Sequence, residues 1–159
     1  MAATGTLGAR LYTSATPLTN LTTSCDAIGD FQGLTIATEL GLIENLGDFG
    51  KQFEMVNFVA VSDGRTYKFK GAYNEGAMDL MVAQDLSDSG QAALLSYGSA
   101  LDQNTYPFKI TIVGADASYD TIYFGAKVMS FRTSMGAVNS IIKASIRLEI
   151  NTPTFIGAS

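Results

Sequence analysis

Residues 66–95 read TYKFKGAYNEGAMDLMVAQDLSDSGQAALL and pass through two kinds of pattern. Apolar and polar side chains alternate at residues 66–71 and again at 77–84, which is typical of strands whose two faces meet different surroundings. A glycine-rich turn separates the two strands. The apolar spacing then changes from that of a strand to that of a helix, so the segment predicts a hairpin followed by a short helix.

The helix is expected at about residues 87–100. Ser87 or Asp88 can cap its first turn by accepting hydrogen bonds from free backbone amides. Because a helix of about three turns is not stable by itself in water, it is expected to lie against a sheet. The side chains at helical spacing, which form its apolar stripe, are Ala93, Leu94, Tyr97 and Leu101.

Five other segments predict strands: residues 34–40, 53–61, 106–113, 120–134 and 140–150. The second of these, FEMVNFVAV, is apolar on both faces, as in a strand that is covered on both sides. Asp63-Gly64, which follows it, indicates a two-residue hairpin turn. In the fourth, strict alternation places Val128 and Phe131 on opposite faces. In the last, the side chains expected to face the core are Ile142, Ala144, Ile146, Leu148 and Ile150.

These elements predict a mainly β fold: a β-sandwich or barrel of six to eight antiparallel strands with one short flanking α-helix at about residues 87–100. The length of 159 residues suits a single domain that spans residues 1–159. Residues 14–30 are rich in Ser, Thr, Asn and Asp, which is typical of loops. Residues 1–30 are therefore expected to form a loose N-terminal arm.

The low charge of the chain fits either a large core or a surface that other protein copies cover, and we favour the second. Apolar residues make up 47% of the chain and charged residues only 16%, below the roughly 25% of soluble domains. The net charge is −5, and residues 1–50 contribute most of it, with one arginine against five carboxylates. Binding to the phosphates of nucleic acid requires clustered Lys and Arg residues, which the chain lacks. Binding to nucleic acid is therefore not expected.

No catalytic residue, cofactor or metal site is expected, and the chain is not expected to be an enzyme. It contains no histidine, and a nucleophilic Cys25 would have no imidazole partner. Asp85 and Asp88 are spaced like helix-capping residues rather than like a catalytic pair. No apolar run approaches the roughly 20 residues of a membrane helix, so no membrane partner is expected either.

Residues 143–149 form a row of mixed charge, in which Lys143, Arg147 and Glu149 share one face of a strand. Two interpretations remain open. The row is a solvated strand face, or it pairs with opposite charges on an adjacent copy.

The order of these elements resembles that of the major tail tube proteins of long-tailed bacteriophages. The resemblance covers roughly residues 41–151, and its parts lie in a fixed order along the chain. They are a hairpin that leads to Lys70-Gly71, a D-x-x-D-x-G-Q-x-A-L helix start at 85–94, a Y-x-F strand at 106–108, and closing strands at 125–131 and 143–150.

The resemblance implies a β-sandwich with a flanking helix that assembles as hexameric rings, which stack into a hollow tail tube. It implies a protein of the virion tail, assembled in the host cytoplasm. The implied partners are other copies of the chain, a tail tip or baseplate initiator, a tape measure protein and a tail terminator. Double-stranded DNA would pass through the tube into the host without specific binding.

Two sets of residues are candidates for roles in such a tube. Residues 41–51, GLIENLGDFGK, resemble the loop that reaches neighbouring subunits, and the candidates there are Leu42, Ile43, Asn45, Asp48 and Phe49. An acidic lumen would repel DNA from the wall, because the duplex carries about one charge per 1.7 Å of its axis. Glu54 and Asp79 are the candidate lumen-facing carboxylates.

Other functions remain open. The chain could be a tube subunit of a contractile or type VI-like injection system, which has the same fold. It could also be a monomeric β-sandwich that binds sugars or a partner protein, an interpretation that the seven tyrosines allow and the absence of tryptophan disfavours.

Overall fold

The computed structural model describes residues 5–114, 118 and 120–158. The chain is mainly β, as predicted, and two helices accompany its strands in these residues. The elements in chain order are β1 (Arg10–Thr13), α1 (Ile28–Gln32), β2 (Thr38–Leu40), β3 (Ile43–Asn45), β4 (Gln52–Val59), β5 (Thr66–Asn74), β6 (Ala77–Ala83), α2 (Ser89–Tyr97), β7 (Tyr106–Thr111), β8 (Thr121–Ser134), β9 (Lys143–Ile150) and β10 (Phe155–Gly157).

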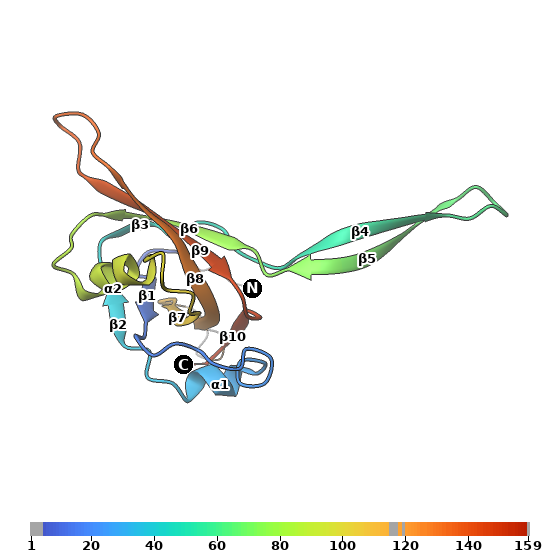
Figure 1. The fold of residues 1–159 in the computed structure, drawn as a ribbon, viewed down its shortest axis with the longest axis horizontal. Helices are drawn as coiled ribbons and strands as arrows, with labels where there is room; N and C mark the ends of the chain where they lie inside the picture. The colour runs from blue at the N-terminus through green and yellow to red at the C-terminus, as the bar shows by residue number, and fades with distance from the viewer. Residues whose placement is uncertain (1–4, 115–117, 119, 159) are drawn as a thin grey trace.

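One antiparallel sheet of eight strands builds the body of the molecule, in the order β2-β1-β7-β8-β9-β6-β3, with β10 also paired to β8. The long strand β8 connects its two halves. Residues 121–126 pair with β7, and residues 126–134 pair with β9. The sheet therefore curls around the core (Figure 1). Buried side chains of β1, β6, β7 and β9 belong to one core cluster.

The core is the apolar inner face of this curled sheet. Met78, Leu80 and Val82 of β6 are buried, as the alternation at 77–84 predicts. On β9 the alternation is confirmed for four of the five inward residues, Ala144, Ile146, Leu148 and Ile150. The fifth, Ile142, lies before β9 begins and is 40% exposed, so its expected place in the core was wrong.

A β-bulge changes the pattern of β8. The register with β9 shifts between Val128 and Ser130, and one extra residue in a strand reverses the alternation that follows it. Phe131 consequently packs against the same core as Val128. The expectation that these two side chains lie on opposite faces was wrong for this reason.

Helix α2 covers one side of the body, close to β2 and β8 (Figure 1). Asp88 is its N-cap and accepts a hydrogen bond from the backbone N–H of Gln91 at 3.0 Å. Leu94 and Tyr97 are buried as expected, but the helix ends before Leu101, which is 94% exposed. The predicted apolar stripe is therefore one turn too long.

A second, smaller core lies on the other face of β8 and involves the N-terminal part of the chain. Phe31 of the short helix α1 packs against Tyr123, and Cys25 is buried beside them. This helix was not predicted, although its apolar residues stand three apart and Asp30 accepts a hydrogen bond from the backbone N–H of Ala27. Residues 10–13 form strand β1 of the sheet. The N-terminal segment that was expected to be loose, residues 1–30, therefore contains an ordered, partly buried strand.

Strands β4 and β5 leave the body as a long two-stranded arm, referred to below as the arm (residues 51–75) (Figure 1). All eight residues of β4 are exposed, so the expectation of a strand covered on both sides is wrong for this single chain. The turn is also longer than predicted. The pairs Ala60 N–Arg65 O and Gly64 N–Ala60 O enclose a loop of four residues, 61–64, at the tip.

Candidate assembly surfaces

One face of the arm is aromatic. Val56 lies opposite Phe69, and Phe58 lies opposite Tyr67, so all four side chains project from the same side of the ribbon. Their exposed fractions are 50%, 56%, 58% and 38% in that order. This set is called the aromatic face. The Arg65 guanidinium lies 5.7 Å from the centre of the Tyr67 ring, and the other three side chains are at least half exposed.

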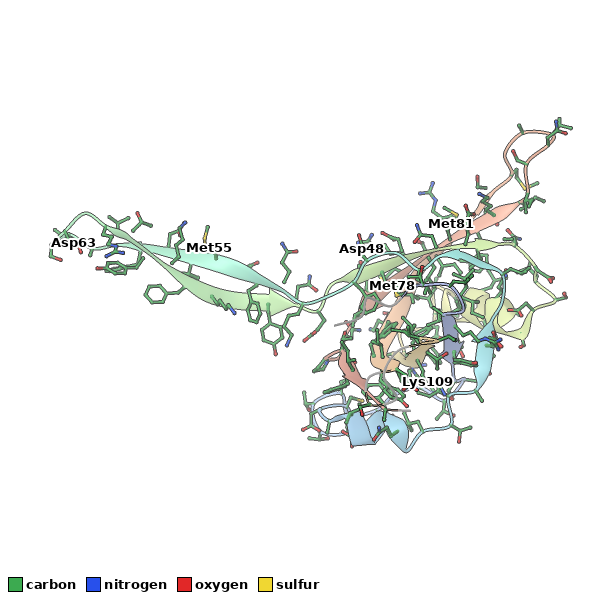
Figure 2. All side chains as sticks on the ribbon, turned by 180° about the vertical axis from the view of Figure 1, so that it is seen from behind. Asp48, Met55, Asp63, Met78, Met81 and Lys109 are labelled. Atoms are coloured by element: carbon green, nitrogen blue, oxygen red, sulfur yellow. The ribbon has the colours of Figure 1, made fainter. Side chains whose placement is uncertain are left out.

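The opposite face of the arm combines lysines with apolar side chains. Met55 lies opposite Lys70, Asn57 opposite Lys68, and Val59 opposite Thr66. Met55 and Val59 are 62% and 57% exposed. This set is called the lysine face. Figure 2 shows side chains projecting from both sides of the ribbon, with Met55 along its length and Asp63 at its tip.

The base of the arm is a close crossing of two backbone segments. A Cβ atom on Gly76 would lie 2.5 Å from the carbonyl oxygen of Gly50. Lys51 forms an ion pair with Glu75, with 3.6 Å between Nζ and Oε1, and its ammonium group lies 4.5 Å from the centre of the Tyr73 ring. These contacts hold the arm where it leaves the sheet.

Several strand edges of the sheet are unpaired in the described part of the chain; among them, β2 pairs with β1 alone and β10 with β8 alone. Strand β3 pairs with β6 alone, and residues 127–134 of β8 pair with β9 alone. Such edges present free backbone N–H and C=O groups, to which a strand of another chain can add.

The hairpin tip between β8 and β9 is a second protrusion, on the side of the body away from the arm (Figure 1). Residues 133–142 contain no charged side chain. The large apolar side chains exposed there are Met135, Val138, Ile141 and Ile142. An exposed apolar group of this kind usually marks an interaction site.

The mixed-charge row of β9 finds its partners within the chain. Arg147 pairs with Asp79 on β6 and with Glu149, and Lys143 pairs with Glu44 at 2.7 Å. These contacts favour the interpretation of a solvated strand face over a row of ion pairs between copies.

The predicted inter-subunit loop, residues 41–51, lies against its own body. Ile43 belongs to β3, and Phe49 packs on Phe124 with 5.8 Å between ring centres. Asn45 accepts a hydrogen bond from the backbone N–H of Gly47. Leu42 and Asp48 are the candidates in this loop that project into solvent without such contacts; Leu42 is 61% exposed and has a positive φ of 60°.

The two candidate lumen carboxylates lie on different parts of the molecule. Glu54 is on the arm, and Asp79 is on the outer face of the sheet, where Arg147 neutralises it. Their exposure agrees with a place on a surface, but the fold does not bring them together.

The sequence reasoning missed the arm as an exposed element. Its apolar content on both faces is the pattern of a buried strand. One signal could have identified it: glycines stand at both of its ends, Gly50 before β4 and Gly76 after β5, as at a crossing where backbones approach closely.

In the described residues, no group of three or more Cys, Asp or Glu side chains could hold a metal ion. Burial raises the pKa of the Cys25 thiol. Burial also raises the pKa of the Tyr106 phenol, and the hydrogen bond that this phenol donates to Asp102 lowers the pKa of that carboxyl. In addition, the described helices are all too short or too polar to cross a membrane.

Comparison with known proteins gives a likeness in structure only. No family model and no curated protein matches the sequence. The chain superposes on a solved structure of the sheath/tube terminator of the extracellular contractile injection system PVC with a TM-score of 0.68, at 10% identity and 99% coverage of both chains.

Two further structures extend the likeness. A tube terminating cap of the anti-feeding prophage gives a TM-score of 0.62 at 14% identity, over 100% of this chain and 93% of that one. The SPP1 tail tube gives 0.57 at 10% identity, over 95% and 77%. The chain has the tail tube fold. The resemblance read from the sequence is therefore confirmed at the level of the fold, which phage tail tubes share with proteins of contractile injection systems.

Proposed function

We propose that the chain is a structural subunit of a phage tail tube, in which copies assemble as hexameric rings that stack into a hollow conduit for the genome. The arm is the observation that carries this proposal. An isolated two-stranded ribbon is marginally stable in water, and this ribbon exposes aromatic side chains that its own body does not cover. Docking onto other copies supplies the missing burial.

The unpaired strand edges support closure into rings. The edge of β3 and the free edge of β8 lie at different places in the sheet, so one copy can offer β3 to the β8 edge of the next. A contact between two different surfaces either closes into a ring or continues as a filament. The proposal uses both: edge pairing closes each ring, and the arm and the β8–β9 tip connect successive rings.

The proposed partners are those of a growing tail: further copies of the chain, a tail tip or baseplate initiator, a tape measure protein and a tail terminator. Assembly takes place in the host cytoplasm, and the product belongs to the virion. The role is mechanical, with no catalytic step, and double-stranded DNA passes through without specific binding.

An acidic lumen remains part of the proposal, supported by the net charge of −5. The identity of the lining face decides how acidic the wall is. The outer face of β6, β8 and β9 carries Lys127, Arg132, Lys143 and Arg147 against Asp79 and Glu149, so a wall made of this face would attract phosphates more than one that displays Glu54. A positive lumen potential in a tube structure would refute the acidic lining.

A contractile injection system is the second candidate, because the sheath/tube terminator described above comes from such a system. Mixing the assembled protein with the sheath protein encoded beside it, where one exists, distinguishes the two. Binding of a sheath along the tube favours the contractile system.

Electron microscopy of the purified chain at rising concentration, with mass from light scattering, tests the proposed function. Rings or hollow tubes, formed alone or on an added tail tip complex, are expected. A particle that stays monomeric even with the tip complex contradicts the proposal and favours a monomeric binding module.

A further inference from the structure

Both faces of the arm expose large apolar side chains to solvent. The aromatic face carries four large side chains, three of them at least half exposed. The lysine face adds Met55 and Val59 to its polar residues, each more than half exposed. A ribbon that lies on a surface normally buries one face and presents a polar one to solvent.

The sequence of β4 has the composition of a strand that is covered on both sides. Residues 53–61 are almost continuously apolar, and the single chain leaves all of β4 exposed. A pattern of this kind is normally satisfied by packing on both faces of a sheet. The missing cover must therefore come from outside the chain, on both faces.

The charges of the arm identify the kind of partner. The arm, residues 51–75, carries four cations against three carboxylates, a net charge of +1, so the rest of the chain carries −6. Three of these cations are Arg65, Lys68 and Lys70. None of these three cations forms an ion pair with the described carboxylates. Opposite charges on two surfaces steer their encounter and fix their register. The acidic body of a second copy is complementary to the basic arm.

We infer that the arm is clamped between two other copies of the chain, with the aromatic face packed on one copy and the lysine face on the other. The inference rests on the proposed function and adds to it that each arm joins three copies. The four aromatic-face side chains supply the apolar contact. Lys68 and Lys70 pair with carboxylates of the second neighbour, while Met55 and Val59 fill the space between them.

Cysteine labelling in the assembled protein tests the inference. Val56→Cys places a thiol on the aromatic face, and Met55→Cys places one on the lysine face. The native Cys25 is fully buried, and Cys25→Ala provides a background without thiols. Each variant is treated with a maleimide as a dilute monomer and as a tube that electron microscopy has verified. Leu101→Cys, on the body and 94% exposed, is the control for general access.

Both arm thiols are expected to react in the monomer and to be protected in the tube. If tubes form and one arm thiol reacts as fast as in the monomer, the clamp is overturned while the proposed function stands. If no tube forms under any condition, both fail. If double-stranded DNA, added to the monomer, protects the arm thiols from the maleimide, the clamp is overturned and the arm is a DNA contact.

A second measurement counts the copies that each arm touches. One copy carries photo-crosslinkers at positions 55 and 56 and is diluted into excess unmodified protein before assembly. Crosslinked trimers are expected, and a product limited to dimers overturns the clamp. Replacing Phe58 or Met55 by Ser should each raise the critical concentration about tenfold, because each removes most of one buried apolar side chain. Leu101→Ser is the matched control and should leave it unchanged.

Discussion

Arg147 on β9 lies directly opposite Asp79 on β6, with 3.2 Å between Nη1 of the guanidinium and Oδ2 of the carboxylate. The same guanidinium donates through Nε to Glu149 at 2.9 Å. The side chains of Arg147 and Asp79 are 47% and 64% exposed, so water screens their attraction. The pair aligns two strands on the outer face of the sheet without a large contribution to stability.

A double-mutant cycle on this pair should give a small coupling energy. Arg147→Ala, Asp79→Ala and the double variant are unfolded with urea, and the coupling is expected to be about 0.2–1 kcal/mol, as for other exposed ion pairs. It should decrease as salt is added, because salt screens exposed charges. A coupling that is several times larger and independent of salt would show that the pair is shielded from water.

Two phenylalanines distinguish the body from the arm. Phe124 is fully buried, and Phe124→Ala should lower the free energy of unfolding by about 3–5 kcal/mol. Phe58 is 58% exposed on the arm, and Phe58→Ala should change the monomer's stability by no more than about 0.5 kcal/mol. Urea unfolding of the monomer measures both. Similar losses for the two variants would contradict the exposure of the arm in the free chain.

The elements that were predicted correctly are those whose sequence pattern arises from contacts within one chain. Strands β6 and β9 alternate because one face meets the core and the other meets water, and their buried residues follow. The cap of α2 was predictable because Asp88 needs only the backbone amides beside it. The bulge in β8 was not predictable, because it depends on the register with β9 rather than on residues near Phe131.

The candidate surfaces were harder to predict for a related reason. An apolar pattern predicts that side chains are buried, but it does not indicate whether the same chain or another chain buries them. Val56 and Phe58 therefore resemble core residues in the sequence, although both are exposed in the single chain. Ile43 and Phe49, which the resemblance places in a loop that reaches a neighbour, pack partly buried against their own core. Their contact with a neighbour stays a prediction.

Removal of the α2 cap should destabilise the body. Asp88 accepts hydrogen bonds from the backbone N–H groups of Gln91 and Gly41, so it ties the helix start to the loop after β2. Asp88→Ala is expected to cost about 1–2 kcal/mol, at the upper end for a cap because Gly41 also loses its acceptor. Thermal unfolding measures this loss. Asp88→Asn, which keeps an acceptor oxygen, is the control and should retain most of the stability; an equal loss in both variants would mean that the charge, not the cap, matters.

The Tyr106–Asp102 hydrogen bond should make stability depend on pH in the acid range. The bond lowers the pKa of the Asp102 carboxyl in the folded chain, so its contribution is present above the ordinary carboxyl pKa and is lost as pH falls through the lowered value. Tyr106→Phe keeps the ring stack with Tyr97, whose centre is 3.7 Å away, and removes only the hydroxyl. Its stability deficit should be constant near neutral pH and should shrink below the ordinary carboxyl pKa.

The control for this prediction is Tyr73→Phe on the arm, where the hydroxyl is lost from a side chain that is 58% exposed. Its stability should follow that of the unmodified chain across the same acid range, as measured by urea midpoints at each pH. A Tyr106→Phe deficit that stays constant into strong acid would show that Asp102 is not the group responsible.

The crossing at the base of the arm should depend on Gly76. Its φ of +92° is unfavourable for a residue with a Cβ, and a Cβ there would meet the Gly50 carbonyl oxygen at 2.5 Å. Gly64 at the arm tip also has a positive φ, but a Cβ at that position would meet open space. Gly64→Ala should therefore cost about 1–2 kcal/mol from backbone strain alone, and Gly76→Ala should cost more because the two backbones must separate. Small-angle scattering of the monomer should show a change in the direction of the arm for Gly76→Ala only, whereas equal behaviour of the two variants would mean that the crossing does not set that direction.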